Sequence, residues 1–489
     1  MLSTFQLHPT TLLAILHIAI LIGISVRVIM RRPNTGVALA WLFIVAALPF
    51  YGAGFYLLIG ERRISRARIR QIAARKADYA KLVQRGIEKG LTQVAWEHHP
   101  IEARGMDRLG MAMIGFPTVA GSSGKLYSET AEILNAITRD IDCAEKTILM
   151  EFYIWNEGGK ADEVLNALIR AAQRGVTCRV LIDALGARPW WKGKQPRRLR
   201  EAGVRVVPAL PVGLFRTFVD RTDLRVHRKI VIIDNAVAWT GSMNLVDPKF
   251  FKQDANVGEW IDAMVRAEGA IIAPLALTII GDWTLETGES IEEVIADVNL
   301  DATTQSGDAD VQVVPSGPGE TDDGLLQMLL ATINSAHQEL VLTTPYLVPD
   351  ESMLRALRGA AARGVEVHMI LPERVDSLLT RYASRSYYDE LMNIGVQIHL
   401  YRSGLLHTKS ITADRHITMF GTVNLDMRSI WINYEVALFV YSSEFGQQIR
   451  NLQQSYIDDS DLMIAGEWAK RSNWQRFLEN SFRLVGPIL

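Results

Sequence analysis

Two histidines of this chain, His227 and His407, are each followed two positions later by a lysine, Lys229 and Lys409. Both pairs lie in segments of β character, and on an extended strand residues i and i+2 face the same side. Each histidine therefore projects beside a fixed positive charge. Such a pair can supply a nucleophile or carry a proton next to that charge.

The two histidines head one longer pattern that occurs twice. In both copies an Asp lies seven residues after the histidine, a Gly fourteen and an Asn seventeen, and the copies are 180 residues apart. One copy of HxKx4D would be only suggestive, but two copies with matching Gly and Asn positions indicate an internal duplication. The further members are Asp234, Gly241 and Asn244 in the first copy and Asp414, Gly421 and Asn424 in the second.

Strands and helices alternate before each copy in the same order. Such alternation predicts a three-layer α/β sandwich in each half, with the boundary in the polar stretch Leu300–Gly319. The predicted strand, helix and strand are Thr147–Trp155, Asp162–Arg174 and Val176–Asp183 in the first half, and Glu339–Val348, Met353–Arg363 and Val365–Leu371 in the second.

Composition limits the function. The 489 residues suffice for two or three domains, and 48% hydrophobic content excludes a disordered polymer. Residues 1–60 carry a charge of +3 and residues 61–89 a charge of +7, so the net charge of −2 leaves −12 for the remaining 400 residues. An acidic body disfavours nucleic acid as a partner. Two cysteines without CxxC or Cys/His clusters exclude a disulfide framework and a structural zinc site.

Two apolar segments near the N-terminus predict a membrane hairpin. Leu12–Val26 is the first, and Val37–Ile59 is a 23-residue stretch without charge. At ~1.5 Å per residue the second covers roughly 35 Å, against about 30 Å of hydrocarbon. A signal peptide is opposed by an N-terminus without Lys or Arg. The arginines after the second segment place the body in the cytoplasm, and the basic helix predicted over 61–90 is expected to attract anionic lipid rather than only to face solvent.

The duplicated motif resembles the signature of the phospholipase D superfamily over about residues 120–489. With the hairpin, the basic linker and the ending Arg483–Leu489, the chain resembles bacterial cardiolipin synthases of the two-span type. The resemblance implies an α/β fold of two phospholipase D-like α/β/α sandwich lobes in a pseudo-two-fold bilobal unit. The implied organisation is a transmembrane hairpin over 1–60 (spans about 10–30 and 37–59), a basic helical linker over 61–119, and lobes over 120–305 and 306–489.

The family implies transfer of a phosphatidyl group between two phosphatidylglycerol molecules through a phosphohistidine, giving cardiolipin and glycerol. It implies phosphatidylglycerol, cardiolipin and anionic membrane lipids as partners, no cofactor or metal, and a multi-pass protein of the bacterial inner membrane. The absence of a GxxxxGK[ST] sequence agrees, since no nucleotide need be consumed. A homo-oligomer is compatible with the sequence. The family's catalytic motif residues correspond here to His227, Lys229, Asp234, His407, Lys409 and Asp414.

The other site residues follow from the chemistry that these two histidines need. Both lysines, together with Ser242, Asn244, Thr422 and Asn424, are expected to surround the non-bridging phosphate oxygens. We interpret Asp234 and Asp414 as structural, because each begins a turn. A carboxylate further along each half should orient the histidine, and by the family's pattern Asp262 and Glu435 match. The spacing from histidine to acid is seven residues longer in the first half, which leaves Glu259 as a rival to Asp262.

The two histidines must play different roles, since one attacks while the other gives a proton. The family implies His227 as nucleophile and His407 as general acid and base. Two differences between the copies are compatible with that division. Arg228 stands where the second copy has Thr408, and about 12 extra residues precede only the first motif. The apolar residues of that insertion, Leu214, Phe215 and Phe218 among them, could guide acyl chains or simply pack.

Other functions stay open at this point. The same site could use water, as a phospholipase D-type hydrolase or nuclease, and phosphatidylethanolamine could replace phosphatidylglycerol with changed pocket contacts. A membrane scaffold with an inactive site has little need of two full motifs. The C-terminal Trp468–Phe482 stretch is either a helix that packs on a lobe, which we favour, or an interfacial helix.

Overall fold

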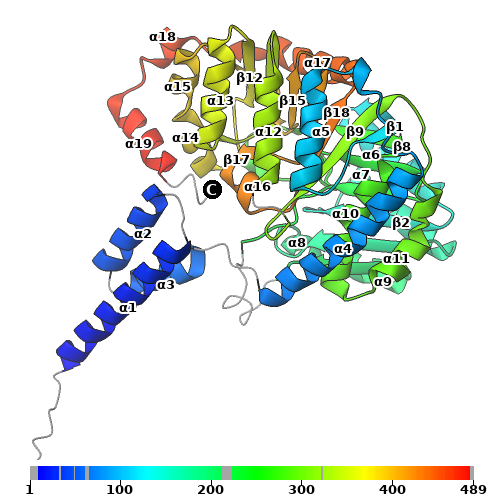
Figure 1. Ribbon diagram of the computed structural model, residues 1–489, viewed down its shortest axis with the longest axis horizontal. Helices are drawn as coiled ribbons and strands as arrows, with labels where there is room; N and C mark the ends of the chain where they lie inside the picture. Colours follow the sequence, from blue (N-terminus) through cyan, green and yellow to red (C-terminus); the bar gives the residue numbers. More distant parts are fainter. Residues whose placement is uncertain are drawn as a thin grey trace, which may run out of the picture. The chain divides into compact units, whose positions relative to one another are not determined.

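The structure is a computed structural model that describes residues 9–31, 35–48, 50–60, 65–211, 223–320 and 323–484. It divides into two compact units, Met1–Arg66 with Val212–Asp223, and Ala67–Pro211 with Leu224–Leu489. The apolar residues Leu214, Phe215 and Phe218 of the first-half insertion lie outside the described residues. Figure 1 shows the elements of both units.

The smaller unit contains one helix that is long enough to cross a membrane. Helix α1 (Pro9–Arg31) has 23 residues, roughly 35 Å at ~1.5 Å per residue, and is the one helix of that length and apolar character among the described residues. Helices α2 (Thr35–Ala47) and α3 (Tyr51–Ile59) follow it. Val28, Val45 and Tyr56 are buried in an apolar cluster formed by the three helices.

The prediction of one continuous helix over the second apolar segment is wrong. The segment 37–59 is divided between α2 and α3, and Phe50 between them has a φ of 62°. The sequence has Pro49 at this point. A proline lacks the amide donor that a helix needs and disfavours helical geometry in the residue before it, so α2 ends after 13 residues. Thirteen helical residues cover roughly 20 Å, which is less than the hydrocarbon thickness.

The larger unit is built on one mixed sheet of fifteen strands. Their order is β19-β13-β12-β10-β15-β16-β18-β9-β1-β8-β6-β5-β2-β3-β4. The first half contributes β1 (Val119–Tyr127), β2 (Thr147–Phe152), β3 (Thr177–Asp183), β4 (Arg205–Ala209), β5 (Ile230–Ile233), β6 (Val237–Gly241) and β8 (Met264–Gly269). The second contributes β9 (Ala309–Ser316), β10 (Glu339–Thr343), β12 (Glu366–Pro372), β13 (Gln397–Tyr401), β15 (Ser410–Ala413), β16 (Ile417–Gly421), β18 (Glu435–Tyr441) and β19 (Ser460–Leu462).

Both halves share this sheet. Strands β1 and β9 pair antiparallel at its centre, with Val119 opposite Val311, so the sheet continues from one half into the other. The parallel strands β2-β3-β4 lie toward one edge and β10-β12-β13 toward the other. The stretch Leu300–Gly319, expected as a polar boundary, therefore contains the strand that begins the second half.

Helices cover both faces of the sheet, as predicted. Helices α6 (Thr130–Asp142) and α7 (Lys160–Gln173) bury their apolar sides on the first half, and α12 (Gly324–Ser335) and α13 (Glu351–Ala362) do so on the second. On the opposite face lie α10 (Ile272–Thr287) and α17 (Ser443–Asp458). The other helices are α5 (Ile101–Met113), α8 (Arg188–Trp191), α9 (Gln195–Glu201), α11 (Ile291–Val298), α14 (Leu378–Arg385), α15 (Tyr388–Asn393), α16 (Met427–Trp431), α18 (Ala465–Trp468) and α19 (Asn473–Arg483).

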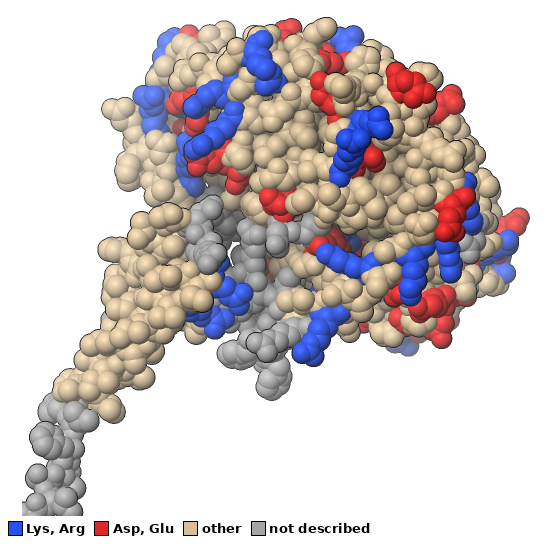
Figure 2. Space-filling model, viewed as in Figure 1, with Lys and Arg blue, Asp and Glu red and all other residues tan. Residues whose placement is uncertain are grey.

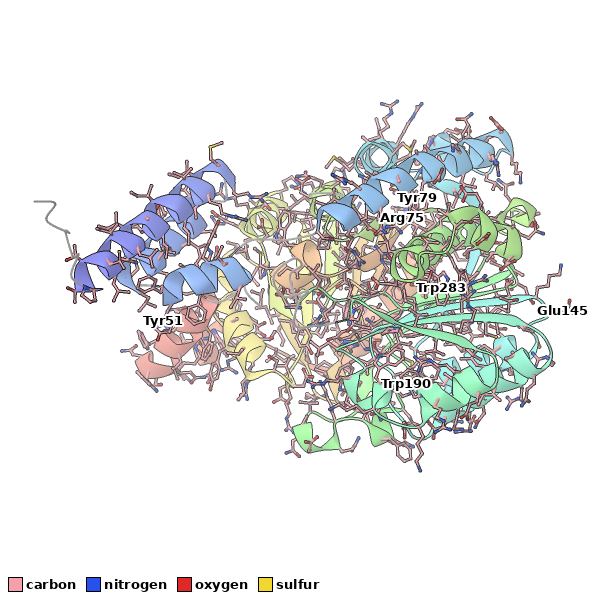
Figure 3. All side chains as sticks on the ribbon, turned by 90° about the horizontal axis from the view of Figure 1, so that it is seen from below. Tyr51, Arg75, Tyr79, Glu145, Trp190 and Trp283 are labelled. Atoms are coloured by element: carbon pink, nitrogen blue, oxygen red, sulfur yellow. The ribbon has the colours of Figure 1, made fainter. Side chains whose placement is uncertain are left out.

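The basic segment after the hairpin forms helix α4 (Arg66–Glu88), as predicted, but part of its charge is engaged by the body. The Arg75 guanidinium donates to the carbonyl of Gly281, and the Tyr79 hydroxyl donates to that of Leu277 at 2.9 Å. Figure 3 shows both side chains directed from α4 toward α10, the helix that carries Trp283. Helix α4 is therefore packed on the first half.

The two aspartates of the repeated motif fasten strand ends. Asp234 begins the turn between β5 and β6 with a φ of 52°, and its carboxylate accepts the amides of residues 145, 146 and 147 at 2.7–2.8 Å. Asp414, with a φ of 51°, accepts those of residues 337, 338 and 339 in the same way. The structural interpretation of both aspartates is confirmed.

This arrangement places Asp234 away from His227, the histidine of its own motif. Seven residues of extended chain, about 23 Å, lie between His227 and Asp234. We expect Asp234→Ala to lower the free energy of unfolding by about 1–3 kcal/mol, because three amides lose a charged acceptor. The kcat of the folded variant should stay within about two-fold of wild type. Asp414→Ala is the matched variant, and a large loss of kcat at unchanged stability would show instead that these carboxylates act in the site.

Candidate active site

The segment leading into each histidine pairs with a strand of the other half. The amide of His227 donates to the carbonyl of Tyr434 at 2.8 Å, and the amide of His407 donates to that of Ile261, also at 2.8 Å. In the second case the pairing is a short parallel ladder between β14 (Leu405–Leu406) and β7 (Trp260–Ile261). The motif of one half is thus placed against the segment of the other half that carries the acid.

The orienting carboxylates are consequently exchanged between the halves. His227 Nδ1 lies 2.8 Å from Glu435 Oε2, and His407 Nδ1 lies 2.7 Å from Asp262 Oδ1. The two predicted acids are in the site, but the pairing of each histidine with the acid of its own half is wrong. Glu259, the rival to Asp262, is exposed.

Burial fixes the protonation of these pairs. It lowers the pKa of both imidazoles to about 4. Burial alone would raise the pKa of the two carboxyls, but the adjacent histidine, lysine and hydroxyl outweigh it and hold the pKa of Glu435 and of Asp262 below the ordinary values. A neutral imidazole then donates Nδ1–H to an ionised carboxylate. This tautomer leaves the Nε2 lone pair available on each ring.

The two lysines bring positive charge into the same buried volume. Lys229 Nζ and Lys409 Nζ each donate to the carbonyl of their own histidine at 2.5 Å. Burial lowers the pKa of Lys229 to about 8 and that of Lys409 to about 7, where the charge of Lys229 contributes as well. Lys409 also lowers the pKa of His227 across the halves. The motifs therefore form one site that favours an anion.

The hydroxyls predicted to bind phosphate serve the carboxylates instead. Ser242 Oγ donates to Asp262 Oδ1 at 2.6 Å, and Thr422 Oγ1 donates to Glu435 Oε2 at 2.5 Å. Each hydroxyl oxygen also accepts a backbone amide at 3.0 Å. With its proton committed to a carboxylate, neither hydroxyl can donate to a phosphate oxygen, so that expectation is wrong for both residues.

The amide side chains of the motif are buried in the site. Asn244 Oδ1 accepts the amide of Ile154 at 3.2 Å. Asn424 Oδ1 is buried and has no hydrogen-bond partner within the part of the chain that the structure describes. Both copies of the motif need a glycine at this position for a steric reason. A Cβ at Gly241 or at Gly421 would lie 2.4 Å from the carbonyl oxygen of Ala263 or Val436, the residue directly after each acid.

The structure adds side chains that the motif did not indicate. The Tyr153 ring lies 5.1 Å from that of His227, and the Trp260 ring lies 4.5 Å from that of His407. Asp183 accepts the amide of Val226 at 2.9 Å and so fixes the chain just before His227. Two features of the sequence could have indicated these residues. Asp183 lies at the end of a predicted strand, and Trp260 lies two residues before Asp262. No group of three or more His, Cys, Asp or Glu suited to a metal occurs in the described ranges.

Comparison with known proteins agrees with this geometry. Residues 137–263 and 329–456 match the family described as "Cardiolipin synthase, PLD-like domain", and residues 19–61 match that described as "Phospholipase_D-nuclease N-terminal". The chain is 41% identical over 494 residues to Cardiolipin synthase A of Erwinia tasmaniensis, with 100% of both chains covered. It is also 41% identical over 478 residues to that of Shigella flexneri, with 98% of each covered.

Among solved structures, the fold is similar to that of phosphatidylserine synthase from Haemophilus influenzae. The TM-score is 0.60 at 14% sequence identity, and the match covers 79% of this chain and 100% of the other. At this identity the likeness bears on the fold alone. Together with the family matches over both halves and the identity to relatives over nearly the whole length, it leads to one assignment. The chain belongs to the cardiolipin synthase family of the phospholipase D superfamily.

Proposed function

We propose that this protein is a phosphatidyltransferase that makes cardiolipin and glycerol from two molecules of phosphatidylglycerol. The observation that carries the proposal is the pair of buried histidines, each held in one tautomer by a carboxylate of the other half. Such a pair supplies one ring to attack and one to carry a proton, as a two-step exchange at phosphorus needs. The relatives named Cardiolipin synthase A support the same reaction.

In the first step, Nε2 of His227 attacks the phosphorus of one phosphatidylglycerol. The bond from phosphorus to the glycerol oxygen breaks, and that oxygen takes the proton held by His407, so glycerol leaves and phosphatidyl-His227 remains. In the second step, neutral His407 takes the proton from a hydroxyl of the second phosphatidylglycerol. Its oxygen attacks phosphorus, the P–N bond breaks, and cardiolipin is released with His227 restored.

The substrate itself favours the protonated form of His407 that the first step needs. Burial and the charge of Lys409 lower the pKa of His407 to about 4, so the ring is neutral at pH 7. A phosphodiester anion beside the ring favours the charged form, because an opposite charge within a few ångströms raises the pKa of a cation. The lysines and the amides of Asn244 and Asn424 are the groups proposed to hold the non-bridging oxygens, where negative charge grows.

The assignment of His227 as nucleophile is supported by a difference between the two halves. Arg228 is fully buried, and its Nε donates to the carbonyl of Glu435 at 2.9 Å while its terminal nitrogen donates to that of Ser316 at 3.0 Å. At the corresponding place Thr408 contacts two neutral groups, the carbonyl of Ile261 at 3.4 Å and the Tyr456 hydroxyl at 3.0 Å. The Arg228 guanidinium thus holds the backbone of Glu435, the acid that orients His227.

We further propose that the protein is a multi-pass protein of the bacterial inner membrane with its body in the cytoplasm, in which α1 makes the first crossing and α2 together with α3 makes the second. Helix α1 and the match of residues 19–61 support membrane association, and the arginines that follow the second apolar segment support the orientation. The acidic charge of the body opposes nucleic acid as a partner.

The direct test uses the purified full chain with phosphatidylglycerol as the only phospholipid. We expect cardiolipin and glycerol to form in equal amounts, and the same rate after treatment with a chelator. Phosphatidic acid as the main product would show a hydrolase instead. Loss of activity in chelator that a divalent ion restores would overturn the metal-free proposal.

Anion binding should draw protons into the site. At pH 7 we expect a soluble, short-chain phosphonate analogue of phosphatidylglycerol to bind with uptake of about one proton. The anion favours the charged forms of His407 and Lys409, whose pKa values are lowered to about 4 and about 7 by burial. Calorimetry in two buffers of different ionisation enthalpy measures the uptake. It should decrease in His407→Gln, and binding without any uptake by the wild type would contradict this account.

A further inference from the structure

Tyr434 holds the segment of chain that leads into His227. Its carbonyl accepts the amide of His227 at 2.8 Å, and its own amide donates to the carbonyl of Arg225, also at 2.8 Å. The next residue along the chain is Glu435, whose Oε2 lies 2.8 Å from His227 Nδ1. The distance between this imidazole and its orienting carboxylate therefore depends on where Tyr434 lies.

The Tyr434 side chain is fully buried and is held from several sides. Its hydroxyl donates to the carbonyl of Pro318 at 3.1 Å and accepts from Arg68 Nε at 3.3 Å. The guanidiniums of Arg68 and Arg228 lie 5.5 and 5.6 Å from the ring centroid, where a cation is attracted to the ring face. A Cβ at Gly317 would overlap the ring. Two cations, a carbonyl and the backbone at Gly317 thus set the position of the ring.

Arg68 reaches this ring from the first turn of α4, nine residues after Ile59 ends α3. Its Nη1 donates to Glu286 of α10 at 2.8 Å, and the two side chains are only 11% and 4% exposed. Figure 2 shows blue atoms on the part of the surface that α4 occupies in Figure 1. The exposed basic residues of α4 are Arg70, Lys76, Lys81 and Arg85. Unlike these four, Arg68 is engaged by the interior of the body.

The second half differs at the corresponding position. The residue before Asp262 is Ile261, and its carbonyl accepts the amide of His407 at 2.8 Å. The Ile261 side chain packs against an apolar cluster that includes Leu406 and Tyr456. An aliphatic side chain can neither accept a hydrogen bond nor attract a guanidinium. The contact with α4 therefore distinguishes the surroundings of His227 from those of His407.

We propose that Arg68 is a positioning residue for His227 and acts through Tyr434. By holding the ring and hydroxyl of Tyr434, the guanidinium keeps Glu435 at hydrogen-bond distance from the imidazole and so keeps Nε2 directed at phosphorus. Attack geometry is demanding, since a displacement of about 1 Å costs on the order of 100-fold in rate. This inference rests on the proposed function, in which His227 is the nucleophile. It makes the helix that follows the membrane hairpin part of the support of the active site.

The first test is a single turnover of the full chain with a short-chain phosphatidyl ester of 4-nitrophenol. His227 Nε2 forms the bond to phosphorus, the bond to the nitrophenol oxygen breaks, and nitrophenolate leaves as an anion that needs no proton. Arg68→Met is combined with Glu286→Gln so that no unpaired carboxylate stays buried, and Glu286→Gln alone is the control. We expect the combined variant to release nitrophenolate roughly ten-fold more slowly than the control, with the same amplitude.

The amplitude separates positioning from folding. If Arg68 served only the fold, fewer molecules would be active, so the amplitude would fall while the rate constant stayed that of the control. That result, or equal rates in the combined variant and the control, would overturn the proposal. Arg70→Met, on the exposed side of the same helix, should change neither quantity.

A second variant tests whether Arg68 acts through the tyrosine. Tyr434→Phe leaves the ion pair of Arg68 with Glu286 in place and should slow the same step. Adding the combined change to Tyr434→Phe should slow it little further, because residues that act through one contact do not have additive effects. Fully additive losses would show that Arg68 does not act through Tyr434.

A spectroscopic measurement gives a readout that does not depend on turnover. The Nδ1–H proton of each histidine is hydrogen-bonded to a carboxylate and should give a downfield proton resonance. Glu435→Gln should shift only the resonance of His227 and so assigns it. In the combined variant this proton should exchange with water several-fold faster than in the control, while that of His407 does not change. Unchanged exchange at His227 would refute the proposal. If the wild type releases no nitrophenolate, the proposed function fails while the exchange rate still tests the positioning.

Discussion

Everything at the centre of this protein depends on two buried hydrogen bonds that cross between its halves. Glu435 holds His227, and Asp262 holds His407. Neither half can therefore present a correctly oriented imidazole without the other. The continuous sheet through β1 and β9, the short pairing of β7 with β14 and the tight approach at Gly241 and Gly421 all bring these partners together.

The near symmetry of the halves hides an electrostatic difference behind the site. In the first half, Arg228 forms ion pairs with Asp282 and Glu320, and Glu151 is fully buried beside them, so burial raises its pKa well above the ordinary range. In the second half, the positions of Arg228 and Glu151 are taken by Thr408 and Thr343, by the alignment of β2 with β10. A duplicated motif has thus acquired two different surroundings, as two different roles require.

The sequence predicted those features that lie within one repeat. The spacing of the motif gave both histidines and both lysines, the turn propensity of Asp gave the roles of Asp234 and Asp414, and the alternation of strands and helices gave the layers. The sequence could not predict that each histidine is oriented by the acid of the other half, because spacing along the chain does not say which half supplies the neighbouring strand. The same reason explains the wrong prediction for Ser242 and Thr422, whose carboxylate partners are Asp262, just before β8, and Glu435, in β18. Pro49 indicated the break after α2, but we interpreted the uncharged segment 37–59 as one membrane span.

Single-turnover trapping tests the crossed site most directly. A phosphatidyl substrate with an activated leaving group needs no general acid, so its transfer to the enzyme reports on the nucleophile alone. With Glu435→Gln we expect formation of phosphatidyl-enzyme to slow by at least about ten-fold, whereas Asp262→Asn should leave formation nearly unchanged and slow the subsequent transfer to an acceptor alcohol. If Asp262→Asn blocks formation and Glu435→Gln does not, then Glu435 does not serve the attacking histidine and the account is wrong.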